Sequence, residues 1–359
     1  MPKPADHLAL SHGPAWKNRV ALAPLTNRQS NADGSLSDDE VAWLTARAVG
    51  GFGLVMTAAA FVTPVGQVWR GQLGVAGPHH LPHLRQLAHG LRAAGARSAV
   101  QLHHGGRRAE RDITGTAALC PWDDPAHDAV AMTPDDISRA VDDFVAAAVV
   151  AEQAGFDGIE VHGAHGYLLG QFLDTSRNHR TDGYGGSLDR RFRIVQEVLA
   201  GIRSATGPDF QLGLRLSPEG FGTTVQDGRE YARRALESGS LDYLDLSLWD
   251  VFMRPRKGGD GLLIDHFVDL PRGGARLGVT GNVRSTADLQ WCLDKGADFV
   301  SVGHGAIVHH DFAARALADP QFVARPMPVS VDVLREERVG PAFVEYLIEA
   351  FPDVVEVSG

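Results

Sequence analysis

The chain has 359 residues, of which 44% are hydrophobic and 22% are charged, as is ordinary for a soluble globular protein. Its formal net charge of −10, without a run of Lys and Arg, argues against nucleic acid or an anionic membrane as the main partner. Two cysteines, Cys120 and Cys292, are too few for a disulfide framework or a four-cysteine metal or cluster site, so redox chemistry would need a bound cofactor.

The N-terminal stretch from Met1 to Trp16 is polar and lacks the basic-then-apolar order of a signal peptide. No apolar run reaches the ~20 residues that a membrane-spanning helix needs. We therefore expect a cytoplasmic protein without a membrane partner.

Short apolar runs alternate with longer amphipathic stretches along the chain. We expect strands at Arg19–Ala23, Gly53–Thr57, Ser98–Leu102, Gly158–His162, Gln211–Leu216, Tyr243–Ser247, Arg276–Val279 and Phe299–Val302. We expect helices between them at Ser37–Val49, Leu81–Ala94, Pro134–Ala154, Leu188–Ala205, Asp227–Glu237 and Ser285–Asp294. The segment between the sixth and seventh strands gives the weakest helical pattern.

Eight strands separated by helices can form a closed barrel or a doubly wound open sheet. Polar and Gly-rich residues follow nearly every strand, whereas an open sheet concentrates them at one switch point. No G-x-G-x-x-G follows the first strand, where a dinucleotide-binding fold would carry one. Both observations favour an α/β fold of the (β/α)8 TIM-barrel type. We expect a single domain, with the barrel over about residues 18–320 and a C-terminal extension over 321–359.

Three groups that can donate a hydrogen bond or a proton follow the fourth strand, where a barrel places its active site: His162, His165 and Tyr167. The two histidines could hold a developing oxyanion, and Tyr167 could supply a proton. They could also be ordinary loop residues or metal ligands, but no nearby Asp, Glu or Cys completes a convincing ligand set.

A longer pattern follows directly, over residues 178–187. It reads Asn-x-Arg-x-Asp-x-Tyr-Gly-Gly-Ser, from Asn178 through Arg180, Asp182 and Tyr184 to Ser187. This pattern resembles the signature of the Old Yellow Enzyme family, and the preceding His162-x-x-His165-Gly-Tyr167 resembles the family's H-x-x-H-G-Y element. We interpret the segment as structural: Ser187 caps the next helix, and the segment as a whole braces the active-site loop without taking part in the chemistry.

The resemblance extends over roughly residues 18–320 and implies bound FMN. It places the turn formed by Ala23, Pro24, Leu25 and Thr26 against the flavin, with Thr26 near the reactive nitrogen. It also implies a backbone contact to the ring at Ala59, preceded by Ala58 where the family usually has Glu. Gln101 and Arg215 match the residues at the pyrimidine edge, where a cation favours the anionic reduced flavin.

The loops after the seventh and eighth strands are expected to bind the FMN phosphate. The candidates are Gly281 and Asn282 in the first loop, and Gly303 and His304 in the second. The family usually has Arg where this chain has His304. A neutral histidine lacks the fixed charge and the bidentate fork, so we expect FMN affinity to weaken as the pH rises.

The mouth of the pocket is expected to be lined by Arg28, Trp69, His103, His104, Trp249 and Phe252. Arg28 stands where some family branches have an aromatic residue. By resemblance, NADPH or NADH reduces FMN and leaves, and an α,β-unsaturated carbonyl or nitro compound then accepts the hydride. His162 and His165 would bind its oxygen, and Tyr167 would protonate the α-carbon.

Other functions compete with this interpretation. Iron–sulfur relatives need more cysteines, and an RNA-modifying flavin barrel would need a basic face. A metal-dependent barrel hydrolase would use His103, His162 and His165 as ligands, and a flavoprotein sensor would bind FMN without turnover. The resemblance also leaves open a homo-oligomer, because some family members take a C-terminal arginine from a neighbouring chain, and Arg335 and Arg338 are the candidates here.

Overall fold

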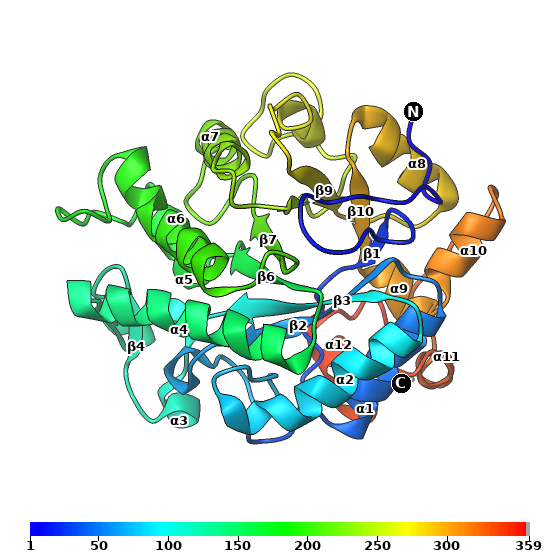
Figure 1. The fold of residues 1–359 in the computed structure, drawn as a ribbon, viewed down its shortest axis with the longest axis horizontal. Coiled ribbons are helices and arrows are strands. Elements are labelled where there is room, and N and C mark those ends of the chain that lie inside the picture. The colour runs from blue at the N-terminus through cyan, green and yellow to red at the C-terminus, as the bar shows by residue number, and fades with distance from the viewer. Residues whose placement is uncertain (357–359) are drawn as a thin grey trace.

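The computed structural model describes residues 1–356. Eight parallel strands close into a barrel in the order β1-β10-β9-β8-β7-β6-β3-β2 (Figure 1). This closed barrel confirms the predicted fold class. The strands are β1 (Val20–Leu22), β2 (Leu54–Phe61), β3 (Arg97–His103), β6 (Gly158–Gly163), β7 (Gln211–Leu216), β8 (Tyr243–Ser247), β9 (Arg276–Thr280) and β10 (Phe299–Val302).

Helices surround the strands (Figure 1). Each of the six predicted helices is present, as α1 (Asp38–Val49), α2 (Leu81–Ala93), α4 (Pro134–Ala154), α6 (Leu188–Ala205), α7 (Val225–Glu237) and α8 (Thr286–Lys295). At the start of α4, the Thr133 hydroxyl accepts a hydrogen bond from the Asp136 amide, and the Asp136 carboxylate accepts one from the Thr133 amide. Gly155, with a φ of 91°, ends the helix in the left-handed conformation that glycine permits.

The chain departs from the predicted elements in two places. Between β8 and β9, the described chain has no α-helix and instead forms one 3-10 turn, Leu263–His266. β2 continues beyond its predicted end, with a register shift against β3 between Met56 and Ala59. The run Ala58 to Ala60 carries no alternation of polar and apolar residues, so its sequence could not reveal either the extension or the bulge.

The long loop after β3 carries its own short elements. They are η3 (Gly106–Arg108), α3 (Arg111–Thr114), β4 (Ala118–Cys120), η4 (Pro125–His127) and β5 (Ala129–Ala131), and β4 pairs with β5 in a two-stranded sheet. A short helix, α5 (Leu168–Leu173), also follows β6. These short elements give the loops that follow β3 and β6 a defined conformation.

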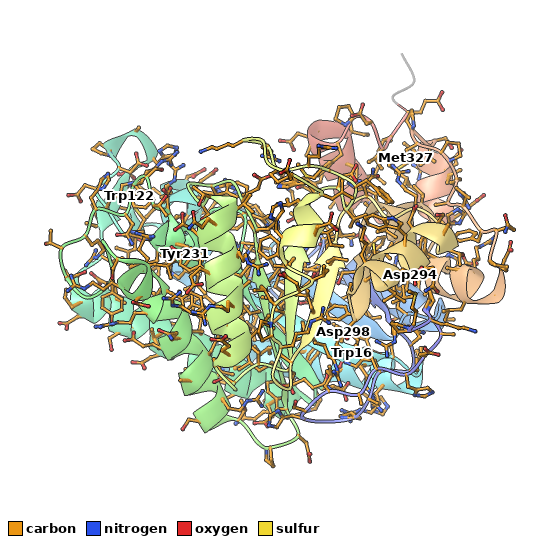
Figure 2. The ribbon with its side chains drawn as sticks, turned by 90° about the horizontal axis from the view of Figure 1, so that it is seen from above. Trp16, Trp122, Tyr231, Asp294, Asp298 and Met327 are labelled. Atoms are coloured by element: carbon orange, nitrogen blue, oxygen red, sulfur yellow. The ribbon has the colours of Figure 1, made fainter. Side chains whose placement is uncertain are left out.

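Aromatic side chains fill the amino-terminal end of the barrel. The Trp16 ring packs edge-on against Tyr243 at 5.5 Å and Phe299 at 5.0 Å between centroids. A Cβ on Gly213 would lie 2.1 Å from the Tyr243 ring, and one on Gly278 would lie 2.1 Å from the Phe299 ring, so both strands need glycine there. Trp16 lies in the lower part of Figure 2, and Met327 of the C-terminal segment lies in the upper part.

The C-terminal extension packs on its own barrel. After α9 (His304–Val308) and α10 (Phe312–Ala318), the chain forms α11 (Val331–Glu336) and α12 (Pro341–Ala350). The Phe343 ring of α12 meets Trp43 of α1 edge-on, with centroids 5.0 Å apart, and the Gly340 amide donates to the Gln29 side chain at 3.0 Å. Within residues 1–356, none of the helices combines the length and the apolar character needed to cross a bilayer.

Candidate active site

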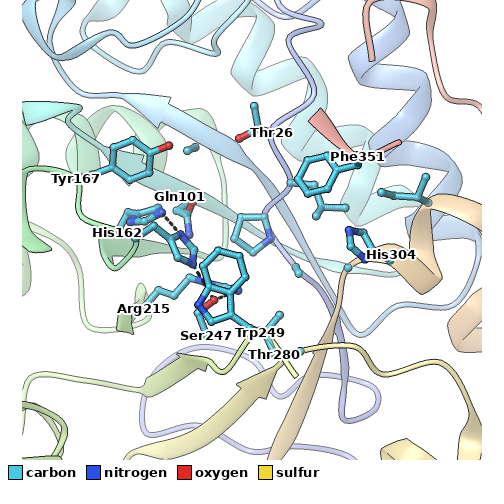
Figure 3. A pocket seen from close by; sticks show the side chains of 18 of the residues that line it. Thr26, Gln101, His162, Tyr167, Arg215, Ser247, Trp249, Thr280, His304 and Phe351 are labelled. Carbon is cyan, nitrogen blue, oxygen red and sulfur yellow. Dashed lines mark hydrogen bonds between the residues drawn. The ribbon is translucent and has the colours of Figure 1, made fainter. Parts of the chain in front are cut away.

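A cavity of about 490 Å³ lies at the carboxyl ends of the barrel strands. Figure 3 shows His162, Gln101 and Arg215 on one side of it, and His304 and Phe351 on the other. The cavity brings together most of the predicted site residues: Ala23, Pro24, Leu25, Thr26, Ala59, Trp69, Gln101, His162, His165, Tyr167, Arg215, Trp249, Gly281, Asn282, Gly303 and His304.

His103 does not line the cavity, contrary to expectation. Its side chain is fully buried, and its Nδ1 lies 3.1 Å from Nε2 of Gln72. The ring packs edge-on against Tyr167, with centroids 4.3 Å apart. His103 is the last residue of β3, and its side chain points into the protein interior. It therefore packs against the Tyr167 ring and does not contact the cavity.

Arg28 also lies outside the cavity lining. Its guanidinium forms an ion pair of 2.6 Å with Glu349 and lies 4.6 Å from the centre of the Tyr346 ring. Arg28 thereby connects the turn after β1 to α12, a contact between distant segments that the sequence could not indicate.

Two further residues expected at the mouth of the pocket, His104 and Phe252, also lie outside the cavity lining. His104 is buried and accepts a hydrogen bond from the Gly106 amide, while Phe252 packs against Trp291. Arg335 pairs with Asp332 on the surface, and Arg338 is exposed.

The two candidate histidines form a connected pair. Nδ1 of His162 accepts a hydrogen bond from the Ala164 amide at 3.2 Å, so the neutral ring carries its proton on Nε2. That Nε2 lies 3.2 Å from Nδ1 of His165, and Nε2 of His165 lies 2.8 Å from the Ser247 hydroxyl. Because a hydroxyl can donate or accept, Ser247 permits either tautomer of His165.

Both histidines are neutral at neutral pH. Burial lowers the pKa of His162 well below its usual range, helped by the nearby His165 and Arg215. Burial and the charge of Arg215 lower the pKa of His165 to about 3. Neutral imidazoles can donate hydrogen bonds to a substrate oxygen without carrying a charge of their own.

Tyr167 occupies the N-cap position of α5, directly after this pair, and its side chain makes no capping hydrogen bond. Its ring lies edge-on to His162, with centroids 5.2 Å apart. Among residues 1–356, no group forms a hydrogen bond with its hydroxyl, and the side chain lines the cavity. A phenol placed in this way can give a proton to a bound molecule.

Left-handed backbone conformations concentrate at the cavity. His165, Phe221, Trp249 and Asn282 have φ values of 58°, 52°, 65° and 49°, and all four line it. Such conformations cost free energy for residues other than glycine and persist where the surrounding structure enforces them. Their concentration marks this cavity as the functional region of the barrel.

A polar layer lies directly beneath the cavity, inside the barrel. Glu160 accepts a hydrogen bond of 2.8 Å from Gln101, and Asp245 accepts one of 2.9 Å from Arg215. Glu160 and Asp245 were not among the site residues predicted from the sequence. The two-residue period of a strand could have revealed both, because Glu160 precedes His162 by two and Asp245 precedes Ser247 by two.

Several further lining residues were not singled out from the sequence, among them Arg108, Phe221 and Ser247. Ser247 and Thr280 stand at the ends of β8 and β9, where a barrel places its site. Residues from the C-terminal segment form one wall: Phe343, Tyr346, Leu347 and Phe351. Nothing in the sequence of α12 indicates that its apolar face covers a ligand cavity and not only the barrel wall.

The predicted phosphate end carries one additional cation. Burial and the neighbouring Arg284 lower the pKa of His304, so His304 is neutral at neutral pH. Nε of Arg284 donates to the Asn282 side chain at 3.3 Å. Arg284 therefore supplies a fixed positive charge near the position where the family usually has an arginine.

The signature segment lies beside the site. Nδ2 of Asn178 donates to the Phe172 carbonyl at 2.7 Å and to the Tyr184 carbonyl at 2.8 Å. The Ser187 hydroxyl caps α6, as expected. The segment thus ties the end of α5 to the start of α6 and lines none of the cavity.

The cavity fits a flavin better than a metal ion. It is mostly apolar, as ring binding requires, and Nε of Arg215 is buried beside it without a hydrogen-bond partner. The open Gly303, the main-chain amide of Asn282 and the His304 ring lie at the opposite end, where a phosphate would be. Over residues 1–356, no three His, Cys, Asp or Glu side chains are arranged to hold a metal ion.

Comparisons with known proteins agree with this geometry. A family model described as the NADH:flavin oxidoreductase / NADH oxidase family matches residues 14–325. The probable NADH-dependent flavin oxidoreductase YqiG of Bacillus subtilis is 33% identical over 318 residues, covering 84% of each chain. An NADPH dehydrogenase of Bacillus pumilus is 33% identical over 299 residues, covering 81% of this chain and 87% of that protein.

A solved structure shares the architecture. Morphinone reductase in complex with tetrahydroNAD superposes with a TM-score of 0.79 at 27% identity, covering 93% of this chain and 94% of that one. The family match spans most of the barrel, and it includes the strand ends that line the cavity. The chain therefore belongs to the NADH:flavin oxidoreductase / NADH oxidase family and is an NAD(P)H-dependent, FMN-containing oxidoreductase of the Old Yellow Enzyme type.

Proposed function

We propose that this enzyme is an ene-reductase, which reduces the activated C=C bond of α,β-unsaturated carbonyl or nitro compounds with NADH or NADPH. The neutral pair His162 and His165 carries the proposal, because their facing nitrogens lie 3.2 Å apart beside Tyr167 in one cavity. Two donors at this spacing suit one oxygen atom that gains negative charge during the reaction.

The histidines would bind the carbonyl or nitro oxygen of the alkene. With its proton on Nε2, His162 donates directly. Before a substrate binds, Nδ1 of His165 accepts the hydrogen bond from Nε2 of His162. His165 donates from Nδ1 once the substrate oxygen replaces it as that acceptor and Nε2 of His165 accepts a hydrogen bond from the Ser247 hydroxyl, 2.8 Å away. Both bonds strengthen as charge moves from the double bond to the oxygen, which lowers the barrier for hydride addition at the β-carbon.

Tyr167 would deliver the proton that completes the reduction. Its hydroxyl can donate to the α-carbon, while the rings of His103 and His162 fix its side chain. The addition then balances, because one hydride and one proton saturate the double bond.

FMN, when bound, supplies the hydride chemistry by accepting a hydride from NAD(P)H and passing it to the alkene. Gln101 and Arg215 would hold its pyrimidine edge, and Thr26 would face the ring. Arg215 stays oriented because Asp245 and Ser247 bind its guanidinium at 2.9 and 3.3 Å. Asn282, Gly303 and His304 would hold the phosphate.

An absorption spectrum of the purified protein tests the proposal. Yellow bands that bleach with NAD(P)H under anaerobic conditions and return on addition of 2-cyclohexenone would support an ene-reductase. Bands that bleach and return only with oxygen would contradict it, and bands that never bleach would favour a flavoprotein sensor.

A further inference from the structure

The charged side chains that line the cavity are positive, although the chain as a whole is acidic. The protein carries 44 Asp and Glu against 34 Lys and Arg, yet no acidic residue among positions 1–356 lines the cavity. Two arginines do line it, Arg108 and Arg215. A cavity walled by cations and neutral groups favours an anionic ligand.

Arg215 and Arg108 differ in whether a carboxylate neutralises the charge of the guanidinium. Arg215 is buried against the Asp245 carboxylate at 2.9 Å. The half-buried Arg108 guanidinium forms no ion pair or side-chain hydrogen bond with any of residues 1–356. Its neighbour Arg107 pairs with Asp124 at 2.8 Å, so the same loop satisfies one arginine and leaves the other available.

Aromatic rings fix the position of the Arg108 guanidinium. It lies 4.9 Å from the centre of the Tyr167 ring and 5.8 Å from that of Phe221. Its charge also contributes to lowering the pKa values of His162 and His165, after the larger effect of burial. Arg108 therefore faces the proposed reaction centre with all its side-chain donors free.

The FMN phosphate cannot be the partner of this cation. Tyr167, which Arg108 covers, lies on one side of the cavity in Figure 3, while His304 of the predicted phosphate end lies on the other. Arg215 is already assigned to the pyrimidine edge of the flavin. Arg108 remains for a second ligand that binds beside Tyr167.

We infer that Arg108 selects alkenes that carry a carboxylate in addition to the activating carbonyl or nitro group. The inference rests on the proposed ene-reductase function. The planar guanidinium can bind a carboxylate through two parallel hydrogen bonds while the histidines hold the activating oxygen.

The surroundings of the mouth agree with an anionic substrate. Arg256 lies 5.5 Å from the centre of the Trp249 ring, and Trp249 is 52% exposed at the cavity. Arg254, Arg256 and Lys257 are exposed in the loop after β8, and none forms an ion pair within the described chain. These charges attract an anion towards a protein that is acidic overall.

A matched pair of substrates tests the inference: 4-oxo-2-pentenoate, an enone with a carboxylate, and its neutral methyl ester. The wild type is compared with Arg108→Gln, Arg108→Lys and Arg85→Gln, the last of which removes an exposed, unpaired charge from α2. The readouts are kcat/KM for each alkene, the rate of reduction by NADH and NADPH, and the Kd of the saturated product levulinate from its effect on the flavin spectrum.

We expect Arg108→Gln to lower kcat/KM for the carboxylate about 10- to 100-fold and to raise the Kd of levulinate similarly, with a much smaller effect on the ester. Arg108→Lys should recover part of the loss, and Arg85→Gln should match the wild type. Equal losses for acid and ester, or no loss for either, would overturn the inference. A loss confined to NADPH would also overturn it, by assigning Arg108 to the nucleotide phosphate. If neither alkene reoxidised the wild-type flavin, the proposed function itself would fail.

Discussion

Glu160 accepts a hydrogen bond of 2.8 Å from Nε2 of Gln101, and the other carboxyl oxygen of Glu160 is buried without a partner. Burial and the neighbouring Asp245 raise the pKa of Glu160 from 4.5 to about 8, against the opposing effects of Arg215 and Gln101. A protonated carboxyl group therefore lies beneath Gln101 at neutral pH, close to the position predicted for the flavin edge.

This pKa makes stability depend on pH in a defined direction. Because the folded-state pKa is raised, the unfolded state loses this proton first, and stability falls as the pH rises from 4.5 towards about 8. Glu160→Gln removes this titration, so the variant should gain at least about 1 kcal/mol on the wild type across that window. Urea unfolding at several pH values measures the difference. The exposed Glu110→Gln serves as the control, and an equal trend in both variants would contradict the assignment.

His162→Ala should damage alkene reduction and spare reduction by NAD(P)H. Loss of one donor to the developing oxyanion typically costs about 10²–10³ in rate. Stopped-flow absorbance separates the two halves of the reaction, so the NAD(P)H step serves as an internal control. Unchanged reoxidation by an enone would exclude the oxyanion role of His162.

Tyr167→Phe keeps the ring that packs against His103 and His162 but removes the proton donor. We expect turnover of a simple enone to fall by about 10²–10⁴, while a nitroalkene still accepts hydride and releases an unprotonated nitronate. Product analysis and the reoxidation rate check both outcomes. An unchanged enone rate would assign the proton to solvent or to another group.

Ser247→Ala removes the hydroxyl that lies 2.8 Å from Nε2 of His165. Without this hydroxyl, Nε2 of His165 has no donor from which to accept, so the tautomer that donates from Nδ1 towards the substrate becomes less favourable, and we expect about a tenfold rise in KM for enones. Ser247→Thr keeps a hydroxyl and should restore most of the affinity. Because Ser247 also contacts Arg215, FMN affinity is measured in parallel, and equal losses of FMN and substrate affinity would indicate a merely structural role.

His304→Arg should tighten FMN binding, because a fixed charge and a bidentate fork replace a ring whose pKa is lowered by burial and by Arg284. In the wild type, a bound phosphate raises that pKa, so affinity is greatest at acidic pH and falls as the pH rises through the pKa of the bound form. Quenching of flavin fluorescence gives the Kd. The variant should lose the histidine contribution to this dependence, and parallel profiles in both proteins would place the phosphate away from His304.

The sequence predicted the fold well, because long apolar periodicities and caps such as Thr133 depend on local chemistry. The bounds of β7, β8 and β10 match the prediction, and so do those of α4 and α6. The register shift in β2 was not predictable, because a run of alanines is compatible with either face of a strand.

Residues at strand ends were predictable as a group, because every parallel strand of a barrel directs its carboxyl end to the same face. Contacts between segments that lie far apart in the sequence could not be predicted. Arg28 was expected at the substrate, yet it meets Glu349, more than three hundred positions later in the chain. The availability of Arg108 was equally hidden, since only the folded loop shows that Arg107 takes the carboxylate of Asp124.

The aromatic cluster of Trp16, Tyr243 and Phe299 closes the barrel at the end opposite the cavity. Within residues 1–356, the way into the site is therefore from the face that carries Trp249 and the α12 wall. In the proposed reaction the nicotinamide donor and the alkene enter through the same opening and occupy the same site one after the other. Steady-state velocities should then give parallel double-reciprocal lines, and an excess of either substrate should inhibit the other by occupying its place.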